Sequence, residues 1–194
     1  LEAAGLAISD NCTTDANLIV TSIDGLSIGS CPITLIRTYT ITDICGNSTT
    51  KSQNITINDN TSPIVTGELT SLAVNGCSIA DAPAAMTSVS QLETAGLTIS
   101  DACTVNVNLV VSHSDSSTSG TCPITFVRTY TLTDICGNLT SKTQTITIND
   151  TTLPIIAGTL TASNATGCSI TDAPAAMTSV SQLEAAGLTI SDNC

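Results

Sequence analysis

Nine cysteines are the residues of this chain best suited to chemistry, and their spacing repeats. Cys12, Cys31, Cys45 and Cys77 return 91 residues later as Cys103, Cys122, Cys136 and Cys168, and Cys194 begins a third set. A zinc site is disfavoured, because the chain has no C-x-x-C pair and its only histidine is His113. Recurring cysteines without histidine partners instead predict disulfides, which persist in oxidising compartments. We therefore expect an extracellular or cell-surface protein.

The positions of the cysteines favour pairing within each repeat. Residues 115–120 read as a hairpin turn, and Cys103 and Cys136 lie at equal distances on either side of it. Cross-strand neighbours can reach the Cα separation of about 5.5 Å that a disulfide needs. We predict the pairs Cys12–Cys45, Cys103–Cys136 and Cys77–Cys122, which leaves Cys31, Cys168 and Cys194 to pair outside this chain. Spacing alone also allows Cys31–Cys77 and Cys122–Cys168, which would link neighbouring domains.

Acidic loops are a second candidate for chemistry. The strings SDNC, TDIC and INDN supply Asp, Asn and carbonyl oxygens, which a hard cation such as calcium prefers. INDN before a proline is similar to the joint sequence of cadherins, where calcium stiffens the linker between domains. The calcium ligands expected on this basis are Asn58, Asp59, Asn149 and Asp150. The alternative is turn chemistry, in which Asn and Asp side chains bond their own backbone.

Two arginines, Arg37 and Arg128, lie between apolar residues in the middle of expected strands. A buried arginine is normally paired, so we expect structural ion pairs with Glu2 and Glu93 or with Asp43 and Asp134. The alternatives are a bulge that turns the arginine outward and a cation that binds a ligand. No Ser-His-Asp set recurs, since His113 has Ser22 at the matching position, and we expect no enzymatic activity.

The cysteines belong to a repeat that covers the whole chain. LEAAGLAISDNC at Leu1 returns as LETAGLTISDAC at Leu92 and LEAAGLTISDNC at Leu183, and the two full periods are roughly two-thirds identical. A 91-residue period exceeds the units of about 20–45 residues found in solenoids and fits one domain per repeat. The joints are expected at ITINDNTSP and ITINDTTLP. These joints make residues 1–60 the C-terminal part of one repeat, 61–151 a complete repeat and 152–194 the N-terminal part of the next. We expect a stretch of a longer array.

The complete repeat reads as all-β with one short helix. Five segments rich in Thr, Val and Ile are bounded by turn residues: 64–74, 97–100, 107–114, 124–133 and 140–148. Ser88 and Gln91 form a capping box before the helix, and Gly96 follows its end. Alternation puts one face of the 124–133 segment inside: Ile124, Phe126, Arg128, Tyr130 and Leu132. The pattern predicts tandem immunoglobulin-like antiparallel β-sandwich domains.

Composition excludes several classes of protein. The formal net charge is −12, whereas a nucleic-acid binder needs a basic surface. Hydrophobic residues make up 41% of the chain, which argues against disorder, and no apolar run is long enough to span a membrane. Aromatic residues are only 2%, so each domain would bury a small aliphatic core and would need disulfides for stability.

The strings CPITLIRTYTITDICGN and QNITINDNTSP resemble the HYR-like, immunoglobulin-like tandem repeats of giant Bacteroidota cell-surface adhesins, of the gliding-motility and type IX secretion type. The resemblance covers the second half of each repeat. It implies export, adhesion or filament formation, and it carries no catalytic residues. We expect a structural segment of an extracellular filament or adhesin stalk, with neighbouring repeats, bundled filaments and surface glycans as partners and no cofactor apart from calcium. The alternative is a multivalent glycan- or ice-binding module.

Overall fold

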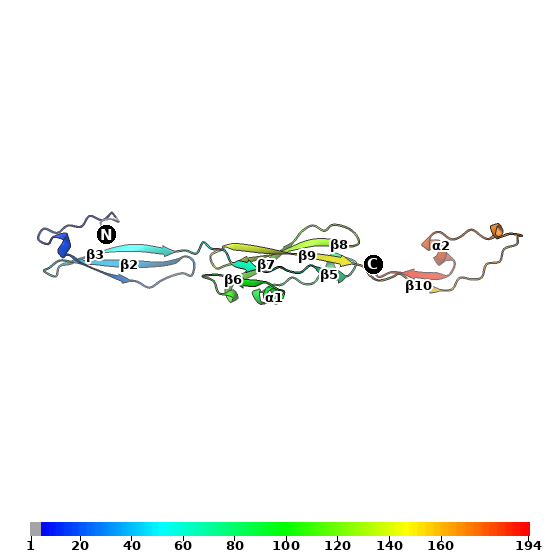
Figure 1. The fold of residues 1–194 in the computed structure, drawn as a ribbon, viewed down its shortest axis with the longest axis horizontal. Coiled ribbons are helices and arrows are strands. Elements are labelled where there is room, and N and C mark those ends of the chain that lie inside the picture. Colours follow the sequence, from blue (N-terminus) through cyan, green and yellow to red (C-terminus); the bar gives the residue numbers. More distant parts are fainter. Residues whose placement is uncertain (1–4) are drawn as a thin grey trace. The chain divides into compact units, whose positions relative to one another are not determined.

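The structure, a computed structural model, describes residues 5–194 and consists mainly of β-strands with short helices between them (Figure 1). The names first, middle and third repeat are used for residues 1–60, 61–151 and 152–194. The strands form several sheets, which include four antiparallel strand pairs and one parallel pair. This secondary-structure content agrees with the expected all-β class, while the immunoglobulin-like topology stays a prediction. None of the described helices is long and apolar enough to cross a bilayer.

The first repeat contains an antiparallel sheet of three strands in the order β1-β2-β3. Its elements are the 3-10 turn η2 (Asp15–Asn17) and the strands β1 (Ile19–Asp24), β2 (Ile33–Thr42) and β3 (Ser48–Ile57). Thr38 of β2 faces Ser52 of β3, and Tyr39 faces Lys51. Strands rich in Thr, Ile and Ser suit this arrangement, because β-branched side chains pack well on a pleated surface.

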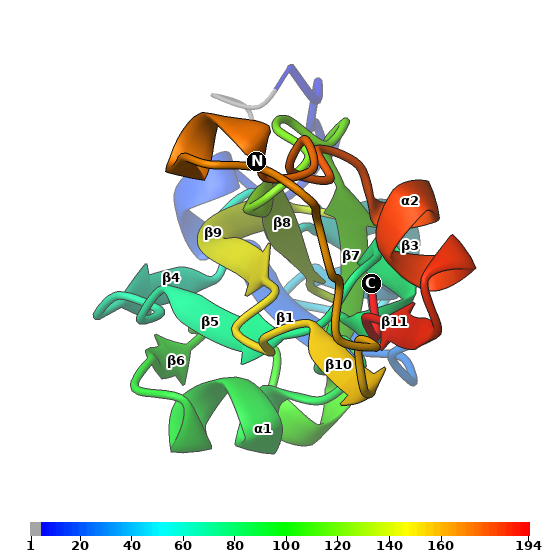
Figure 2. The same cartoon turned by 90° about the vertical axis from the view of Figure 1, so that its right-hand side faces the viewer.

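The middle repeat has two sheets, one of order β4-β6 and one of order β5-β9-β8-β7. Its elements are β4 (Ile64–Thr66), β5 (Leu72–Asn75), η3 (Ile79–Asp81), α1 (Val89–Thr94), β6 (Thr98–Ser100), η4 (Asn106–Asn108), β7 (Val110–Asp115), β8 (Ile124–Thr133) and β9 (Leu139–Asn149). Helix α1 lies beside β6 (Figure 2). The third repeat contains β10 (Ile155–Gly158), η5 (Ile170–Asp172), α2 (Val180–Ala185) and β11 (Leu188–Ser191), and β10 pairs with β11 as β4 pairs with β6.

The predicted helix and its caps are confirmed. Ser88 Oγ accepts a hydrogen bond from the Gln91 amide, and Gln91 Oε1 accepts one from the Ser88 amide at 3.2 Å. Gly96 follows the helix with φ +111°, a conformation that residues with a Cβ rarely adopt. The same box recurs at Ser179 and Gln182 in α2.

The predicted strand 64–74 is divided in two, and this is a correction. Gly67 has φ +85° and ends β4, and a Cβ at this position would lie 2.5 Å from the carbonyl oxygen of Gly96. The chain therefore bends at Gly67 and enters β5, which pairs with β9 in parallel. The expectation of a purely antiparallel sandwich was wrong at this strand.

Two compact units divide the chain, and each takes residues from two repeats. Unit 1 comprises Leu1–Glu68, Met86–Ser112 and Tyr130–Lys142, and unit 2 comprises Leu69–Ala85, His113–Thr129 and Thr143–Cys194. The buried apolar residues of unit 1 are Val89, Leu92, Leu97, Ile99, Leu109, Tyr130 and Leu132. In unit 2, Phe126, Ile146 and Ile148 form a buried cluster against which Leu72, Val74, Ala82 and Ile124 pack. The predicted inner face of β8 is confirmed, since its residues are buried or half-buried.

We expect Leu92→Ala to lower the free energy of unfolding by about 2–5 kcal/mol, because the leucine is fully buried and its loss leaves a cavity. The matched control is Leu183→Ala, which changes the equivalent residue of α2, where the side chain is only half-buried. Urea denaturation of both variants measures the difference. An equal decrease in the free energy of unfolding for the two variants would contradict the assignment of Leu92, but not Leu183, to a buried core.

Candidate functional site at the joints between repeats

Five of the nine cysteines occur in a D-x-C motif that fixes their backbone. In each motif the cysteine amide donates a hydrogen bond to Oδ1 of the aspartate two residues earlier, at 2.8–2.9 Å; the pairs are Asp10–Cys12, Asp43–Cys45, Asp101–Cys103, Asp134–Cys136 and Asp192–Cys194. This is turn chemistry of the kind that the sequence allowed, because a short carboxylate can accept from its own backbone. It holds each of these cysteines at the tip of a loop.

The Asp134 turn shows how firmly one such loop is held. Asp134 also accepts from the backbone and the side-chain amide of Asn138, both at 2.8 Å, and the Gly137 amide returns to the Asp134 carbonyl. Burial acts to raise the pKa of Asp134, but the hydrogen bonds from Asn138, Cys136 and Gly137 outweigh it and hold the pKa below its ordinary value. The string TDICGN therefore encodes a rigid turn that presents Cys136.

Two disulfides are present, and each joins cysteines that belong to different repeats. Cys31 bonds Cys136 with a Cα separation of 5.2 Å, and Cys77 bonds Cys194 with a Cα separation of 5.1 Å. Both separations fit ordinary disulfide geometry. The first bond lies within unit 1 and the second within unit 2. The compact units thus each contain one joint between repeats.

These bonds correct the predicted pairing. The pairs Cys12–Cys45, Cys103–Cys136 and Cys77–Cys122 do not form, and Cys31 and Cys194, expected to pair outside the chain, are bonded within it. The alternatives Cys31–Cys77 and Cys122–Cys168 had the right kind of link, between domains, with the wrong partners. In the described residues Cys12, Cys45, Cys103, Cys122 and Cys168 carry free thiols and are exposed.

Symmetry about the hairpin predicts where these cysteines lie but not what they bond. The prediction that Cys103 and Cys136 lie at the same end of the repeat agrees with the structure. The aspartates two residues before them, Asp101 and Asp134, have carboxylate oxygens within 4.8 Å of each other. Likewise Cys77 and Cys122 line one hollow of unit 2 together with Cys194. Cysteines at one end of a repeat do not bond each other; the bonded cysteines, Cys31, Cys77, Cys136 and Cys194, instead link across the joints.

Three aspartates, one from each of the acidic loop motifs, converge in unit 1. Oxygens of Asp59, Asp101 and Asp134 all lie within 4.8 Å of one another. One carboxylate oxygen of Asp59 and one of Asp101 are buried and have no hydrogen-bond partner. Buried anionic oxygens without partners are costly, and a hard cation is the ligand that would satisfy them. These residues are therefore the ones that could hold calcium.

Part of this arrangement recurs in unit 2, where Asp150 and Asp192 occupy the positions equivalent to Asp59 and Asp101, and their carboxylate oxygens lie within 4.8 Å of each other and of Cys194 Sγ. Of the expected calcium ligands, Asp59 and Asp150 are thus found in these clusters. The Asn58 side-chain amide instead donates to Asn60 Oδ1, and Asn58 Oδ1 lies 3.2 Å from Cys31 Sγ. Asn149 Oδ1 lies 3.6 Å from Cys122 Sγ. The spacing of the motifs could not show which of these side chains meet.

Both arginines form ion pairs, but with aspartates other than the expected ones. Arg37 binds Asp24 at 2.6 Å and Arg128 binds Asp115 at 2.8 Å, across the β1-β2 and β7-β8 strand pairs respectively. The expected partners Asp43, Glu93 and Asp134 were wrong, and Glu2 lies outside the described residues. Arg128 also donates to the carbonyl of Pro83 and lies 5.7 Å from the Phe126 ring centre. Strand register decides this choice, since Arg37 and Asp24 are directly opposite each other.

No family model matches the chain, and no curated protein matches it. Its function must therefore be inferred from its own sequence and geometry.

We expect millimolar calcium to raise the melting temperature of the oxidised chain, because a cation at Asp59, Asp101 and Asp134 would bind the folded state only. Asp101→Asn should reduce this increase, while Asp15→Asn, at an exposed 3-10 turn, should not. Differential scanning calorimetry with calcium and with a chelator measures both. An equal calcium effect in the two variants would exclude this cluster as the site.

The Arg128–Asp115 pair should make stability depend on acid pH. The hydrogen bonds from Arg128 lower the pKa of Asp115 below its ordinary 3.8. A depressed carboxyl pKa stabilises the fold above the pKa of the unfolded chain, and this stabilisation is lost as the pH falls through the folded-state pKa.

Asp115→Asn should therefore lower the free energy of unfolding at pH 7 by more than about 1 kcal/mol, and its deficit relative to the unsubstituted chain should shrink below pH 3.8. Asp24→Asn is the matched control, because the Asp24–Arg37 pair is exposed and screened by solvent. Urea titrations at pH 7, 4 and 2.5 make the comparison. A constant deficit for Asp115→Asn across these pH values would contradict the prediction.

Proposed function

We propose that this chain is a structural segment of an extracellular filament or adhesin stalk, whose consecutive repeats are locked together by disulfides. The observation that carries the proposal is that both disulfides connect different repeats, at sequence separations of 105 and 117 residues. A bond within a domain would stabilise that domain alone. A bond between successive repeats instead holds the linker between them, which would otherwise extend first when the chain is under tension.

The length of the closed loops makes each bond strongly stabilising. In the chain-entropy model a loop of about 100 residues stabilises the folded state by about 4.7 kcal/mol. This is a large fraction of the roughly 5–15 kcal/mol that holds an ordinary domain folded. Such bonds persist outside the cell, which supports the extracellular location and the resemblance to cell-surface adhesin repeats.

The two disulfides also interlace along the sequence. Cys77 lies between Cys31 and Cys136, and Cys136 lies between Cys77 and Cys194. A single break of the backbone anywhere between Cys31 and Cys194 therefore leaves the two pieces connected by at least one disulfide. A stalk exposed to extracellular proteases would keep its covalent continuity after one cut.

The alternative, a multivalent glycan- or ice-binding module, has less support. Ice binding would need a regular exposed array of threonines, and Thr38, Thr40 and Thr42, which alternate along β2, are all half-buried. Thr38 Oγ1 also lies 3.4 Å from Ser52 Oγ on the neighbouring strand. A surface that binds ice or a sugar needs an exposed array.

Limited trypsin digestion tests the proposed interlacing. All four basic side chains that trypsin recognises, Arg37, Lys51, Arg128 and Lys142, lie between Cys31 and Cys194. After the free thiols are alkylated, singly cut chains should migrate with the intact chain on a non-reducing gel and separate only on reduction.

The control is Cys31→Ser, which removes one bond. A cut after Lys51 should then release residues 1–51 without reduction, whereas a cut after Lys142 should still release nothing, because Cys77–Cys194 spans it. Release of fragments from the unsubstituted chain after one cut would refute the locked-joint proposal.

A further inference from the structure

The two disulfides divide the chain into three segments that share the same two ends. Cys31–Cys136 forms one covalent junction, within unit 1, and Cys77–Cys194 forms another, within unit 2. The segments are numbered in chain order: segment I is residues 31–77, segment II is residues 77–136 and segment III is residues 136–194. Because the bonds interlace, segments I and III both lead from the unit 1 junction to the unit 2 junction, and segment II leads back. Three stretches of backbone therefore connect the two junctions in parallel.

Segments I and III lie side by side in unit 1. Three side chains of segment III bind segment I, and their order along one segment matches the order of their partners along the other. The contacts are Asn138 Nδ2 to the Asp59 carbonyl at 3.1 Å, Thr140 Oγ1 to the Pro63 carbonyl at 2.6 Å, and Lys142 Nζ to a Glu68 carboxylate oxygen at 2.7 Å. Both segments thus advance in the same direction.

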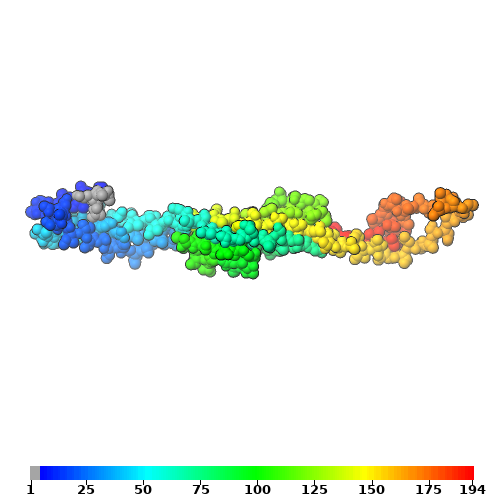
Figure 3. Space-filling view, viewed as in Figure 1, coloured from blue at the N-terminus to red at the C-terminus, as the bar shows by residue number. Residues whose placement is uncertain are grey.

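The same direction is kept in unit 2. Gln144 of segment III donates to the Thr70 carbonyl of segment I at 2.9 Å, and β9 of segment III pairs in parallel with β5 of segment I. Figure 3 shows the two stretches in contact, residues 59–75 in cyan to green and residues 138–151 in yellow. Two extended segments that lead side by side from one junction to the other must pair in parallel, as these do.

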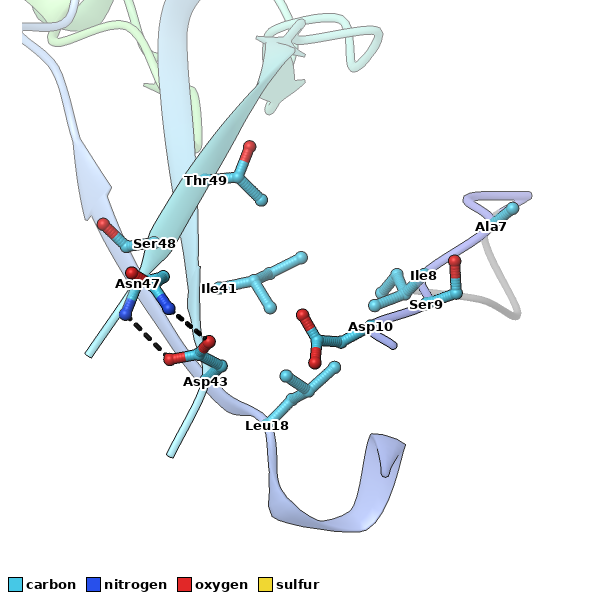
Figure 4. A pocket seen from close by; sticks show the side chains of 10 residues that line it. All are labelled: Ala7, Ile8, Ser9, Asp10, Leu18, Ile41, Asp43, Asn47, Ser48 and Thr49. Atoms are coloured by element: carbon cyan, nitrogen blue, oxygen red, sulfur yellow. Dashed lines mark hydrogen bonds between the residues drawn. The ribbon is translucent and has the colours of Figure 1, made fainter. Parts of the chain in front are cut away.

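Local turns anchor the junctions to the folded chain. The unit 1 junction is held by the Asp134 turn described above, and in the unit 2 junction the Cys77 amide donates to Asp81 Oδ2 at 2.8 Å. Figure 4 shows the first-repeat copy of the Asp134 turn, in which Asn47 donates to Asp43 through its backbone amide at 2.7 Å and its side-chain amide at 2.8 Å. Tension on the sulfur atoms is thus delivered to turns that hydrogen bonds hold in place.

This covalent arrangement decides how tension is carried between the junctions. Segments I and III are fixed to the same two points, so a force that separates these points stretches both together and does not slide one along the other. With Cys77–Cys194 alone, tension from the N-terminal side would pass through segment I and leave segment III slack. With Cys31–Cys136 alone, it would pass through segment III and leave segment I slack. Both bonds are needed for the load to be shared.

The shortest segment limits how far the junctions can separate. At about 3.3–3.6 Å per residue, segment I reaches at most roughly 150–165 Å, whereas residues 31–194 of a reduced chain reach roughly 540–590 Å. Opening of the buried groups of either unit under load cannot lengthen this part of the chain beyond the limit of segment I. An opened unit also refolds more readily, because the bonds have already removed much of the loop-closure entropy.

We propose that the interlaced bonds make this part of the chain a strain limiter, in which segments I and III carry tension together and segment I sets the maximum extension. Strain limitation rests on the proposed function, because it matters only in a stalk that bears tension. It requires more than survival of one cut, since both bonds must be present in the same molecule. Cuts in two different segments then leave the remaining segment to carry the load.

Force spectroscopy on chains cut after lysine tests the strain limiter. The two lysines of the chain, Lys51 and Lys142, lie in segments I and III. Oxidised chains with alkylated free thiols and a peptide handle at each terminus are stretched before and after cleavage by a lysine-specific endoproteinase in urea. Without the handles, uncut chains should extend to roughly 250–280 Å and reduced chains to roughly 640–695 Å. Chains cut at both lysines should still hold tension through segment II and extend roughly 50 Å further than uncut ones.

Matched variants each remove one bond without adding a thiol. Cys31→Ser/Cys136→Ser and Cys77→Ser/Cys194→Ser chains should both hold tension when uncut, because the remaining bond and the backbone are intact. Both should lose tension after the same cleavage, because one terminal fragment is then released together with its handle.

Loss of tension by the cut, unsubstituted chain would overturn the strain limiter. Peptide mapping of the same sample then distinguishes this result from failure of the proposed function. If mapping finds both bonds, they occur in different molecules, so the repeats are still linked and the proposed function stands. If mapping finds neither bond, the proposed function fails as well.

Discussion

The two disulfides that join successive repeats, held in place by the D-x-C turns, are the constraint on which the rest of this structure depends. An aspartate two residues before the cysteine accepts the cysteine amide, so the sulfur is positioned before any bond is made. Two of these turns, at Asp101 and Asp134, bring their carboxylates within 4.8 Å of that of Asp59. The D-x-C motif thus contributes to both the covalent links and the acidic cluster.

A repeat of this composition has little else with which to stabilise itself. Aromatic residues are 2% of the chain, and the buried residues are mainly Leu, Ile and Val in two small groups. Each group lies in a compact unit that also contains one joint. Long-range disulfides compensate for a small core because they remove entropy from the unfolded chain, and they do so most for long loops.

Much of the local structure could be predicted from the sequence, because it depends on neighbours in the chain. The capping box at Ser88, the end of the helix at Gly96 and the inner face of β8 all follow from periodicity and side-chain chemistry. The break at Gly67 was missed, because its positive φ is required by the close approach of the Gly96 carbonyl, a contact between distant segments.

The site was only partly predictable for the same reason. The acidic motifs were recognised, but the convergence of Asp59, Asp101 and Asp134 depends on tertiary placement. Arg128 was expected to be paired, yet its partner Asp115 is chosen by strand register. The predicted cysteine pairing was wrong, because symmetry about a hairpin shows which cysteines lie at the same end of a repeat. It does not show which residues those cysteines face. A 91-residue period with four cysteines contained the missing clue, because equivalent bonds must shift by one period.

Mass spectrometry of a complete, non-reduced tryptic digest tests the central claim most directly. Cleavage after Arg37, Lys51, Arg128 and Lys142 gives fragments 1–37, 38–51, 52–128, 129–142 and 143–194. Disulfides between repeats predict that 1–37 is linked to 129–142 and that 52–128 is linked to 143–194. Linkage of 1–37 to 38–51 and of 52–128 to 129–142 would instead mean that each repeat satisfies its own cysteines, and it would contradict the account.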